Sequence, residues 1–291
     1  MSIKPTIVPF LFFAVTLCPL VAKPKPQVVV SIPPQKAFVY ALVGEAVELQ
    51  VLLQPGQSPE NFALSPKLMS KLANADVYFG VGAPMEDFVL PRIESSYPHI
   101  QIVDTSAGIR KRSLNDHTHD DPHDDHGHTH VTDPHVWLSP GLAKIQLRHY
   151  SRKLKEIVPD LSETIDQNAE RFLEKVNQVD KELAEKLKDL RGNTIFVYHP
   201  SFGYFLNRYG LRQETVELQG KPPTAKQLQT LISKAKEHQV KVIFIQPQFQ
   251  SRSAQALAQA IGGTVEELDP LAEDYLANLS DMGEAIARSF R

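Results

Sequence analysis

Histidine and aspartate are concentrated in one short stretch of the chain, residues 116–130, where eleven of the fifteen residues are of these two types. The six histidines are His117, His119, His123, His126, His128 and His130. No residue of the stretch could join an apolar core, so we expect a disordered surface loop. Imidazoles and carboxylates are the ligands that zinc and similar divalent ions prefer. The loop therefore predicts metal handling, the alternative being a solvated insertion without a role.

Single metal-ligating side chains also occur in four segments where a predicted strand meets a loop or helix. They are Glu60 within residues 55–62, His135 within 133–140, His199 within 198–205 and Asp269 within 267–271. Ligands for an ion held in a cleft are expected in such loops. Each residue also has a structural alternative. The two histidines could cap a helix or bond the backbone, Asp269 could cap the last helix, and Glu60 could be a surface residue, with water completing a three-ligand site.

The elements that must position these side chains alternate between strands and helices. We expect strands over residues 27–32, 47–53, 76–80, 100–103, 194–198, 211–216, 240–245 and 264–268. We expect helices over residues 37–43, 65–72 with Ser65 as N-cap, 85–93, 141–157, 202–208, 225–238, 254–261 and from 271 onward. This alternation predicts the α/β fold class with mainly parallel sheets.

One long helix is predicted to interrupt the alternation. Apolar residues recur at spacings of three, four and seven from Leu161 to Leu190, and Gly192 follows as a stop. This pattern is typical of an amphipathic helix of about thirty residues. We therefore predict a lobe over residues 23–158, a linking helix over 159–191 and a second lobe over 192–291. Each lobe is a mainly parallel sheet flanked by helices, and a metal cleft lies between the lobes.

The N-terminus predicts export. Lys4 precedes a stretch, residues 7–20, that is apolar apart from Thr16, and Ala22 offers a small residue before a cut. This pattern is typical of a cleavable signal peptide, residues 1–22, and it is too short for a comfortable membrane span. We expect a periplasmic protein. A lipid anchor on Cys18 is the alternative, although the preceding Leu17 is bulky where lipid attachment sites want a small residue.

The composition narrows the chemistry further. Cys18 is the only cysteine and lies in the segment to be removed, so a metal must be held by His, Asp and Glu. The 31 basic and 34 acidic residues give a net charge of −3, which does not favour nucleic acid as a partner. The chain has no HExxH, GxSxG or P-loop pattern. We expect a monomer that is not an enzyme.

Several motifs occur in a fixed order along the chain. They are Ser31-Ile32-Pro33-Pro34, PGQSPE followed by LSPKLMSKLANADVYFGVG, DPHVWLSP, YHPSFGYFLNRYGL, IQPQFQSRSAQALA and Asp269-Pro270-Leu271. Together they resemble the metal-specific substrate-binding proteins of bacterial ABC transporters, the zinc and manganese uptake family, over essentially the whole mature chain. The resemblance implies two α/β lobes bridged by a long helix that limits hinge motion. It also implies four metal ligands, two from each lobe, which would be Glu60, His135, His199 and Asp269.

The resemblance further implies the role and the cargo. Such a protein releases its ion to the membrane permease of an ABC transporter. The family usually has His where this chain has Glu60, and a carboxylate weakens the preference for zinc over Mn(II) or Fe(II). A His-rich loop marks the zinc carriers, so we expect Zn(II), collected by the loop and bound in the cleft, with affinity fading below about pH 6.5. The alternatives are a manganese or iron(II) carrier, and a periplasmic zinc buffer or adhesin without a transporter.

Overall fold

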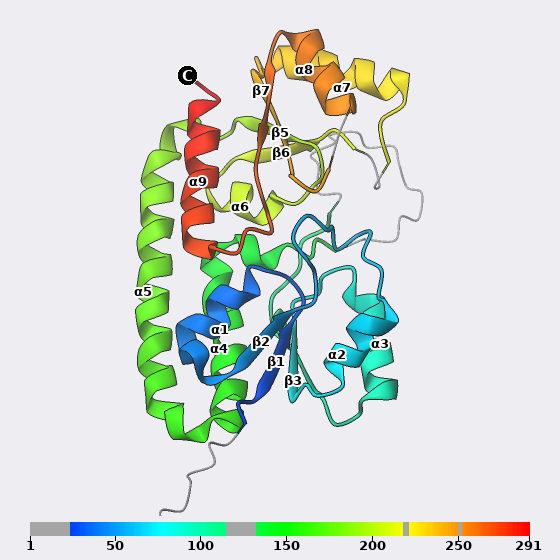
Figure 1. The fold of residues 1–291 in the computed structure, drawn as a ribbon. Coiled ribbons are helices and arrows are strands. Elements are labelled where there is room, and N and C mark those ends of the chain that lie inside the picture. The colour runs from blue at the N-terminus through cyan, green and yellow to red at the C-terminus, as the bar shows by residue number, and fades with distance from the viewer. Residues whose placement is uncertain (1–23, 115–131, 218–220, 250–251) are drawn as a thin grey trace, which may run out of the picture.

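Two α/β lobes are stacked along one long helix (Figure 1). This computed structural model describes residues 24–114, 132–217, 221–249 and 252–291. The predicted signal peptide, residues 1–22, and the His/Asp-rich segment, residues 116–130, lie outside the described residues. The predicted fold class is confirmed, because each lobe contains one wholly parallel sheet flanked by helices.

The first lobe is built on a four-stranded sheet with the order β2-β1-β3-β4. Its strands are β1 (Gln27–Val30), β2 (Glu48–Val51), β3 (Val77–Gly80) and β4 (Gln101–Asp104). Its helices include α1 (Gln35–Val43), α2 (Pro66–Leu72) and α3 (Glu86–Ser96). The central strands β1 and β3 are almost entirely buried. They are continuous apolar runs because helices cover both faces of the sheet.

The second lobe repeats this arrangement with the order β6-β5-β7-β8. Its strands are β5 (Thr194–Val197), β6 (Arg212–Thr215), β7 (Val242–Ile245) and β8 (Thr264–Glu267). Its helices are α6 (Gly203–Arg208), α7 (Ala225–Glu237), α8 (Arg252–Ile261) and α9 (Tyr275–Arg288). In both sheets, the connection after one central strand leads to one edge strand, and the connection after the other central strand leads to the opposite edge strand. The carboxyl ends of these strands are where open α/β sheets usually bind ligands.

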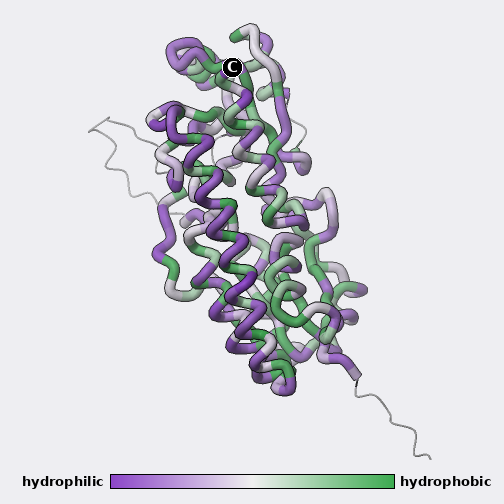
Figure 2. Tube along the Cα trace, turned by 90° about the vertical axis from the view of Figure 1, so that its left-hand side faces the viewer, coloured by the Kyte–Doolittle hydropathy of each residue, from purple (hydrophilic) through white to green (hydrophobic). Residues whose placement is uncertain are grey.

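Two further helices, α4 (Pro140–Ile157) and α5 (Ser162–Lys186), form the side of the molecule. The 25 residues of α5 contact α1 and α4 of the first lobe and α9 of the second. Its outward surface is largely hydrophilic (Figure 2), while Ile165, Phe172, Val176 and Leu183 are buried. Within the described residues, no helix is long and apolar enough to cross a membrane.

Aromatic side chains join the two lobes in one core. Phe38 of α1 lies 5.2 Å from Phe172 of α5 and 5.0 Å from Tyr275 of α9, measured between ring centroids. All three rings belong to a single cluster of buried residues that extends through both lobes. Burial of rings this large contributes strongly to stability, so the lobes are fixed to each other along this side.

Several helix ends differ from the sequence prediction, and the largest differences are at α9 and α5. The last helix begins at Tyr275 rather than at 271, because the Asp274 side chain accepts a hydrogen bond from Ala277 N and caps it there. The long helix proper covers residues 162–186, with 3-10 turns over Pro159–Leu161 and Lys188–Leu190 at its ends. The cap at Ser65 is confirmed, since its side chain accepts from Leu68 N.

Candidate metal centre

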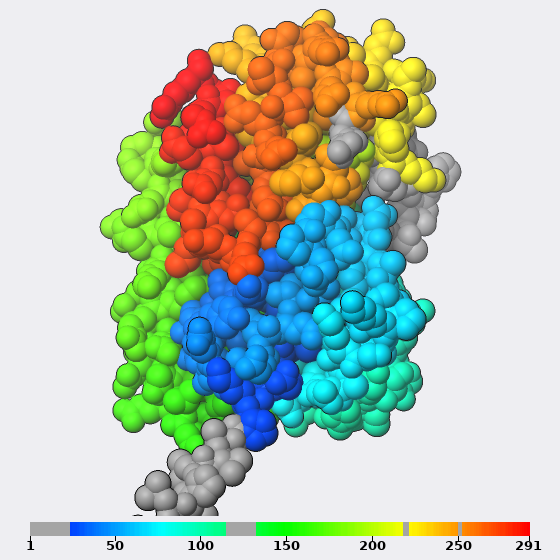
Figure 3. All heavy atoms as spheres, in the orientation of Figure 1, coloured from blue at the N-terminus to red at the C-terminus, as the bar shows by residue number. Residues whose placement is uncertain are grey.

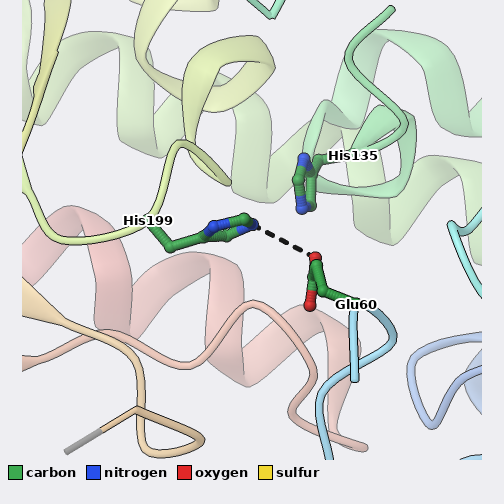
Figure 4. A group of neighbouring side chains, drawn as sticks. All are labelled: Glu60, His135 and His199. Carbon is green, nitrogen blue, oxygen red and sulfur yellow. Dashed lines mark ion pairs between the residues drawn. The ribbon is translucent and has the colours of Figure 1, made fainter. Parts of the chain in front are cut away.

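Three of the four predicted ligands meet between the lobes (Figure 4). Glu60 comes from the loop after β2, His135 from the loop before α4, and His199 from the loop after β5. Their potential ligand atoms all lie within 4.8 Å of one another. Nε2 of His199 lies 3.1 Å from Oε1 of Glu60. Side chains from both lobes therefore converge on a single point.

The loop that carries His199 is held in place by the side chain of Gln246. Its loop leaves the carboxyl end of β5, and Gln246 follows the neighbouring strand β7. The fully buried Gln246 side chain accepts a hydrogen bond from His199 N at 3.3 Å and donates to His199 O at 2.7 Å. It also donates to Ser201 Oγ at 3.2 Å. One amide side chain thereby fixes the turn that presents His199.

Each histidine is oriented by a buried carboxylate on its far side. Oδ1 of Asp133, which is 1% exposed, lies 2.8 Å from Nδ1 of His135 and also accepts from His135 N. Oε1 of Glu217, which follows β6, lies 2.5 Å from Nδ1 of His199. When Nδ1 donates to a carboxylate, the Nε2 lone pair is free to bind a metal, and this pairing recurs in metal sites.

The Nε2 atom of His199 points toward the other two candidate ligands. It is buried, lies 3.1 Å from Oε1 of Glu60, and makes no well-aligned hydrogen bond within the described part of the chain. The ring of His199 stacks on that of Phe249 with centroids 5.2 Å apart and meets that of His135 edge-on with centroids 5.6 Å apart. A buried nitrogen without a well-aligned hydrogen bond is costly, and a cation bound between Nε2 and the Glu60 carboxylate would remove that cost.

The charges of the centre are strongly coupled. Burial alone would raise the pKa of Glu60, but the hydrogen bonds and positive charge of His199 and the Ser58 hydroxyl lower it to about 2. Burial alone would lower the pKa of His199, but its hydrogen bond to Glu217 and the negative charge of Glu60 raise it to about 9. Without a metal, His199 therefore keeps its proton at neutral pH, and this charge offsets one of the two neighbouring carboxylates.

The space between these side chains is small. The cavity that they line has a volume of about 10 Å³, roughly that of one water-sized probe. Its walls are Ser58, Pro59, Glu60, His135, Trp137, His199, Ser201, Gln248, Phe249, Pro270 and Leu271. A cavity of this size could hold a single small ion and is too small for an organic substrate.

Asp269 does not join the three-residue group. Its Oδ1 accepts from Gln248 Nε2 at 3.0 Å and from Leu271 N at 2.9 Å. It lines a separate open groove of about 900 Å³ beside the centre, which Lys36 and Glu273 also line. The next residues, Pro270 and Leu271, do line the small cavity. The structure thus brings Asp269 to the edge of the centre and not into it.

The sequence reasoning missed the two carboxylates behind the histidines. Asp133 stands two residues before His135, and this spacing could have suggested the contact. Glu217 is 18 residues from His199, and no local pattern links them; only the pairing of β5 with β6 brings the two together. The six histidines of segment 116–130 lie outside the described residues.

Comparisons with known proteins agree with this geometry. The family described as "Zinc-uptake complex component A periplasmic", ZnuA, matches residues 28–289. The high-affinity zinc uptake system protein ZnuA of Yersinia pestis is 30% identical over 270 residues, covering 84% of this chain and 82% of that protein. A crystal structure of ZnuA is 31% identical, with a TM-score of 0.84 over 92% of this chain and 100% of that chain.

A zinc-bound ZnuA deletion mutant is similar as well, at 32% identity and a TM-score of 0.83, covering 91% of this chain and 98% of that one. The family match spans both lobes, both central sheets and all three converging side chains. The chain belongs to the ZnuA family, the periplasmic component A of zinc-uptake complexes.

Proposed function

We propose that this protein binds a Zn(II) ion outside the cytoplasm and delivers it to the membrane permease of an ABC transporter for uptake. The observation that carries the proposal is the convergence of Glu60, His135 and His199 on a one-ion cavity. Behind each imidazole a buried carboxylate orients the ring for metal binding. Membership of the zinc-uptake family supports both the cargo and the transport role.

Asp269 is proposed as the fourth ligand. Structural and transported zinc is usually bound by four ligands in a tetrahedron, and three are already present. Asp269 stands two residues beyond β8, as His199 stands two residues beyond β5. To reach the ion, its carboxylate would exchange the bond to Gln248 for the metal. A water molecule in the fourth position is the alternative.

The finer points of the cellular role rest on the sequence. We propose that residues 1–22 are removed on export to the periplasm, that the mature protein is a monomer, and that the histidines of segment 116–130 collect zinc near the centre. A carrier of this kind has no catalytic residues. The small cavity supports that view, because a zinc hydrolase needs an open coordination position and space for its substrate.

The deciding experiment is a calorimetric titration of residues 23–291 lacking 116–130 with Zn²⁺ and Mn²⁺. We expect one tight zinc site, preferred over manganese. His135→Gln and His199→Gln should each weaken zinc by more than about tenfold, since even loss of a supporting side chain costs that much. His149→Gln is the matched control, because His149 hydrogen-bonds Ala107 O away from the centre. If tight binding disappears with residues 116–130, the centre is wrong and a metal buffer is the better interpretation.

The fourth ligand is tested separately by Asp269→Asn. If Asp269 binds the ion, this change lowers zinc affinity by about tenfold or more, because a neutral amide is a poor ligand beside a carboxylate. If water completes the site, the variant binds zinc as the parent protein does. Both results leave the three-residue centre intact.

The carboxylate of Glu60 favours one further candidate, a carrier for Mn(II) or Fe(II). Oxygen ligands suit these ions better than a third imidazole would. A clear preference for Mn²⁺ in the same titration would replace zinc as the cargo without changing the site.

A further inference from the structure

The chain leading into and out of the His/Asp-rich segment forms a short stem beside the metal centre. Asp133 N donates to Arg112 O at 2.9 Å, and Ser113 pairs with Thr132 in an antiparallel bridge. We call Arg112, Ser113, Thr132 and Asp133 the stem. The stem ends two residues before His135. A shift of the stem is therefore expected to move His135 as well.

The second lobe holds the stem through one hydroxyl group. Tyr204 on α6 accepts a hydrogen bond from Arg112 N at 3.0 Å and donates one to Asp133 O at 3.2 Å. A single oxygen therefore ties both strands of the stem to the other lobe. The Arg112 guanidinium lies over the same ring, 5.8 Å from its centroid, which adds a cation–π attraction.

A glycine makes this close approach possible. A Cβ atom on Gly203, the first residue of α6, would lie 2.5 Å from Nη1 of Arg112 and 2.9 Å from Oδ2 of Asp133. Real Cβ atoms do not come this close to such atoms. Any other residue at position 203 would push the Arg112 and Asp133 side chains away from α6.

Asp133 connects this contact to the metal centre. Its Oδ2 faces Nε of Arg112 at 3.8 Å, and its Oδ1 holds both the backbone and Nδ1 of His135. The Asp133 carboxylate thus faces Arg112 with Oδ2 and binds His135 with Oδ1. Whatever fixes Asp133 also fixes the direction in which Nε2 of His135 points.

We propose that Arg112 on the stem, together with Gly203 and Tyr204 on the opposite lobe, are positioning residues for the metal centre, which hold Asp133 against His135. The stem then supports the metal centre, and breaking the contact between Tyr204 and the stem lowers the affinity for the ion. This inference rests on the proposed function, because it assigns these residues to retention of the metal carried there.

The sharpest test is Tyr204→Phe in the mature chain, because it deletes both hydrogen bonds and keeps the ring. Zinc affinity is measured by competition with a chelator of known strength, and we expect a loss of about tenfold. Tyr209→Phe is the matched control. Tyr209 follows the same helix, α6, and donates to Asp180 of α5, so this change should leave zinc affinity unchanged. Arg112→Gln should weaken zinc similarly, Arg112→Lys should restore part of the loss, and Arg110→Gln should change nothing.

A second readout does not need zinc. In NMR spectra of the metal-free protein, the Nδ1–H proton of His135 bonded to Asp133 should be visible in the parent chain and lost in Tyr204→Phe. The corresponding proton of His199, bonded to Glu217, should persist in both, which rules out general unfolding.

The outcomes separate the two proposals. If Tyr204→Phe and Arg112→Gln keep the parent affinity and the His135 signal, the positioning role is wrong. If the parent chain binds no zinc and Tyr204→Phe still loses the His135 signal, Tyr204 does position His135, while the proposed function and the assignment to metal retention fall.

Discussion

At the scale of single residues, His199 of the metal-free centre is held in its protonated form. His199 lies between Glu60 and Glu217, and both carboxylates stabilise its charged form. A divalent ion that binds Nε2 of His199 must displace that proton. The sequence alone suggested ordinary imidazoles that lose their proton near pH 6.5. The two neighbouring carboxylates move the transition upward, and neither contact could be read from local sequence.

Zinc affinity should therefore rise with pH from about 6.5 to about 9, since the pKa of His199 is raised to about 9. At pH 7.5, binding should release about one proton. Calorimetry in two buffers of different ionisation enthalpy counts that proton. An affinity that is flat over this range, with no proton released, would contradict the protonated state of His199.

The same raised pKa affects the metal-free protein's stability in the opposite direction. The charged form of His199 is favoured by folding, so its contribution is fully present below pH 6.5 and is lost as the pH rises through about 9. Glu60, with a pKa lowered to about 2, loses its contribution only as the pH falls from 4.5 through about 2. We expect the melting temperature of the metal-free chain to fall between pH 6.5 and 9, by calorimetry.

Glu217 should matter nearly as much as a ligand. Glu217→Gln keeps an acceptor near Nδ1 of His199 but removes the charge, and we expect zinc affinity to fall by about ten- to a hundredfold. Glu214→Gln is the control on the same stretch of chain, because Glu214 pairs with Lys234 instead. Equal affinity for the two variants, measured by chelator competition, would exclude the supporting role of Glu217.

At the scale of elements, two equal sheets are used in different ways. In the first lobe, the crevice at the ends of β1 and β3 is filled by Glu86. Its carboxylate accepts from Ser31 Oγ at 2.5 Å, Val81 N at 2.9 Å and Gly82 N at 2.9 Å. In the second lobe, the corresponding place holds Gln246, which supports the loop of His199. In the first lobe the crevice is therefore filled by a side chain of the protein. In the second lobe the loop at the same place carries the candidate ligand His199.

The alternation of strands and helices was predictable because buried strands and amphipathic helices leave clear periodic patterns. The start of α9 was not, since Asp274 competes as a cap with the earlier Asp269 and only the fold decides between them. Glu60, His135 and His199 were proposed from motifs, and the structure brings them together. The position of Asp269 depends on its bonds to Gln248 and Leu271, which no sequence pattern encodes.

Helices α5 and α9 approach closely at one glycine. A Cβ on Gly283 would lie 2.1 Å from Cδ2 of the buried Leu183. Ala favours a helix over Gly by about 1 kcal/mol, but overpacking costs about 1–3 kcal/mol. We expect Gly283→Ala to destabilise the protein in urea unfolding, and Leu183→Ala to relieve the clash, so that the two changes couple favourably. A stabilised Gly283→Ala would show that Leu183 simply moves aside.

At the scale of the whole molecule, the lobes meet along a seam on the face drawn in Figure 3. The aromatic contact of Phe38, Phe172 and Tyr275 closes one side of it. An ion pair between Lys36 of α1 and Glu273 crosses it elsewhere. With α5 packed against both lobes, large separation would expose core residues. Uptake and release of the ion are therefore expected to involve small movements around the centre.

Small-angle X-ray scattering should detect this rigidity. The scattering curve of the parent chain should change little when zinc is added. Phe172→Ala removes the central ring, costs about 3–5 kcal/mol of stability and should make the metal-free chain more extended than the zinc-bound one. A large change in the parent chain on adding zinc would contradict the restraint by the aromatic contact.

Trp137, the only tryptophan of the chain, lines the small cavity of the metal centre. The indole N–H of Trp137 donates to Pro270 O at 2.7 Å, and its ring lies 5.2 Å from that of His135. Indole fluorescence is sensitive to nearby charge and to the polarity around the ring. Exchange of a proton for a doubly charged ion beside it, or a shift of the loop after β8 that holds Pro270, is expected to alter that emission. The protein thus contains its own optical indicator of cargo, readable without any label.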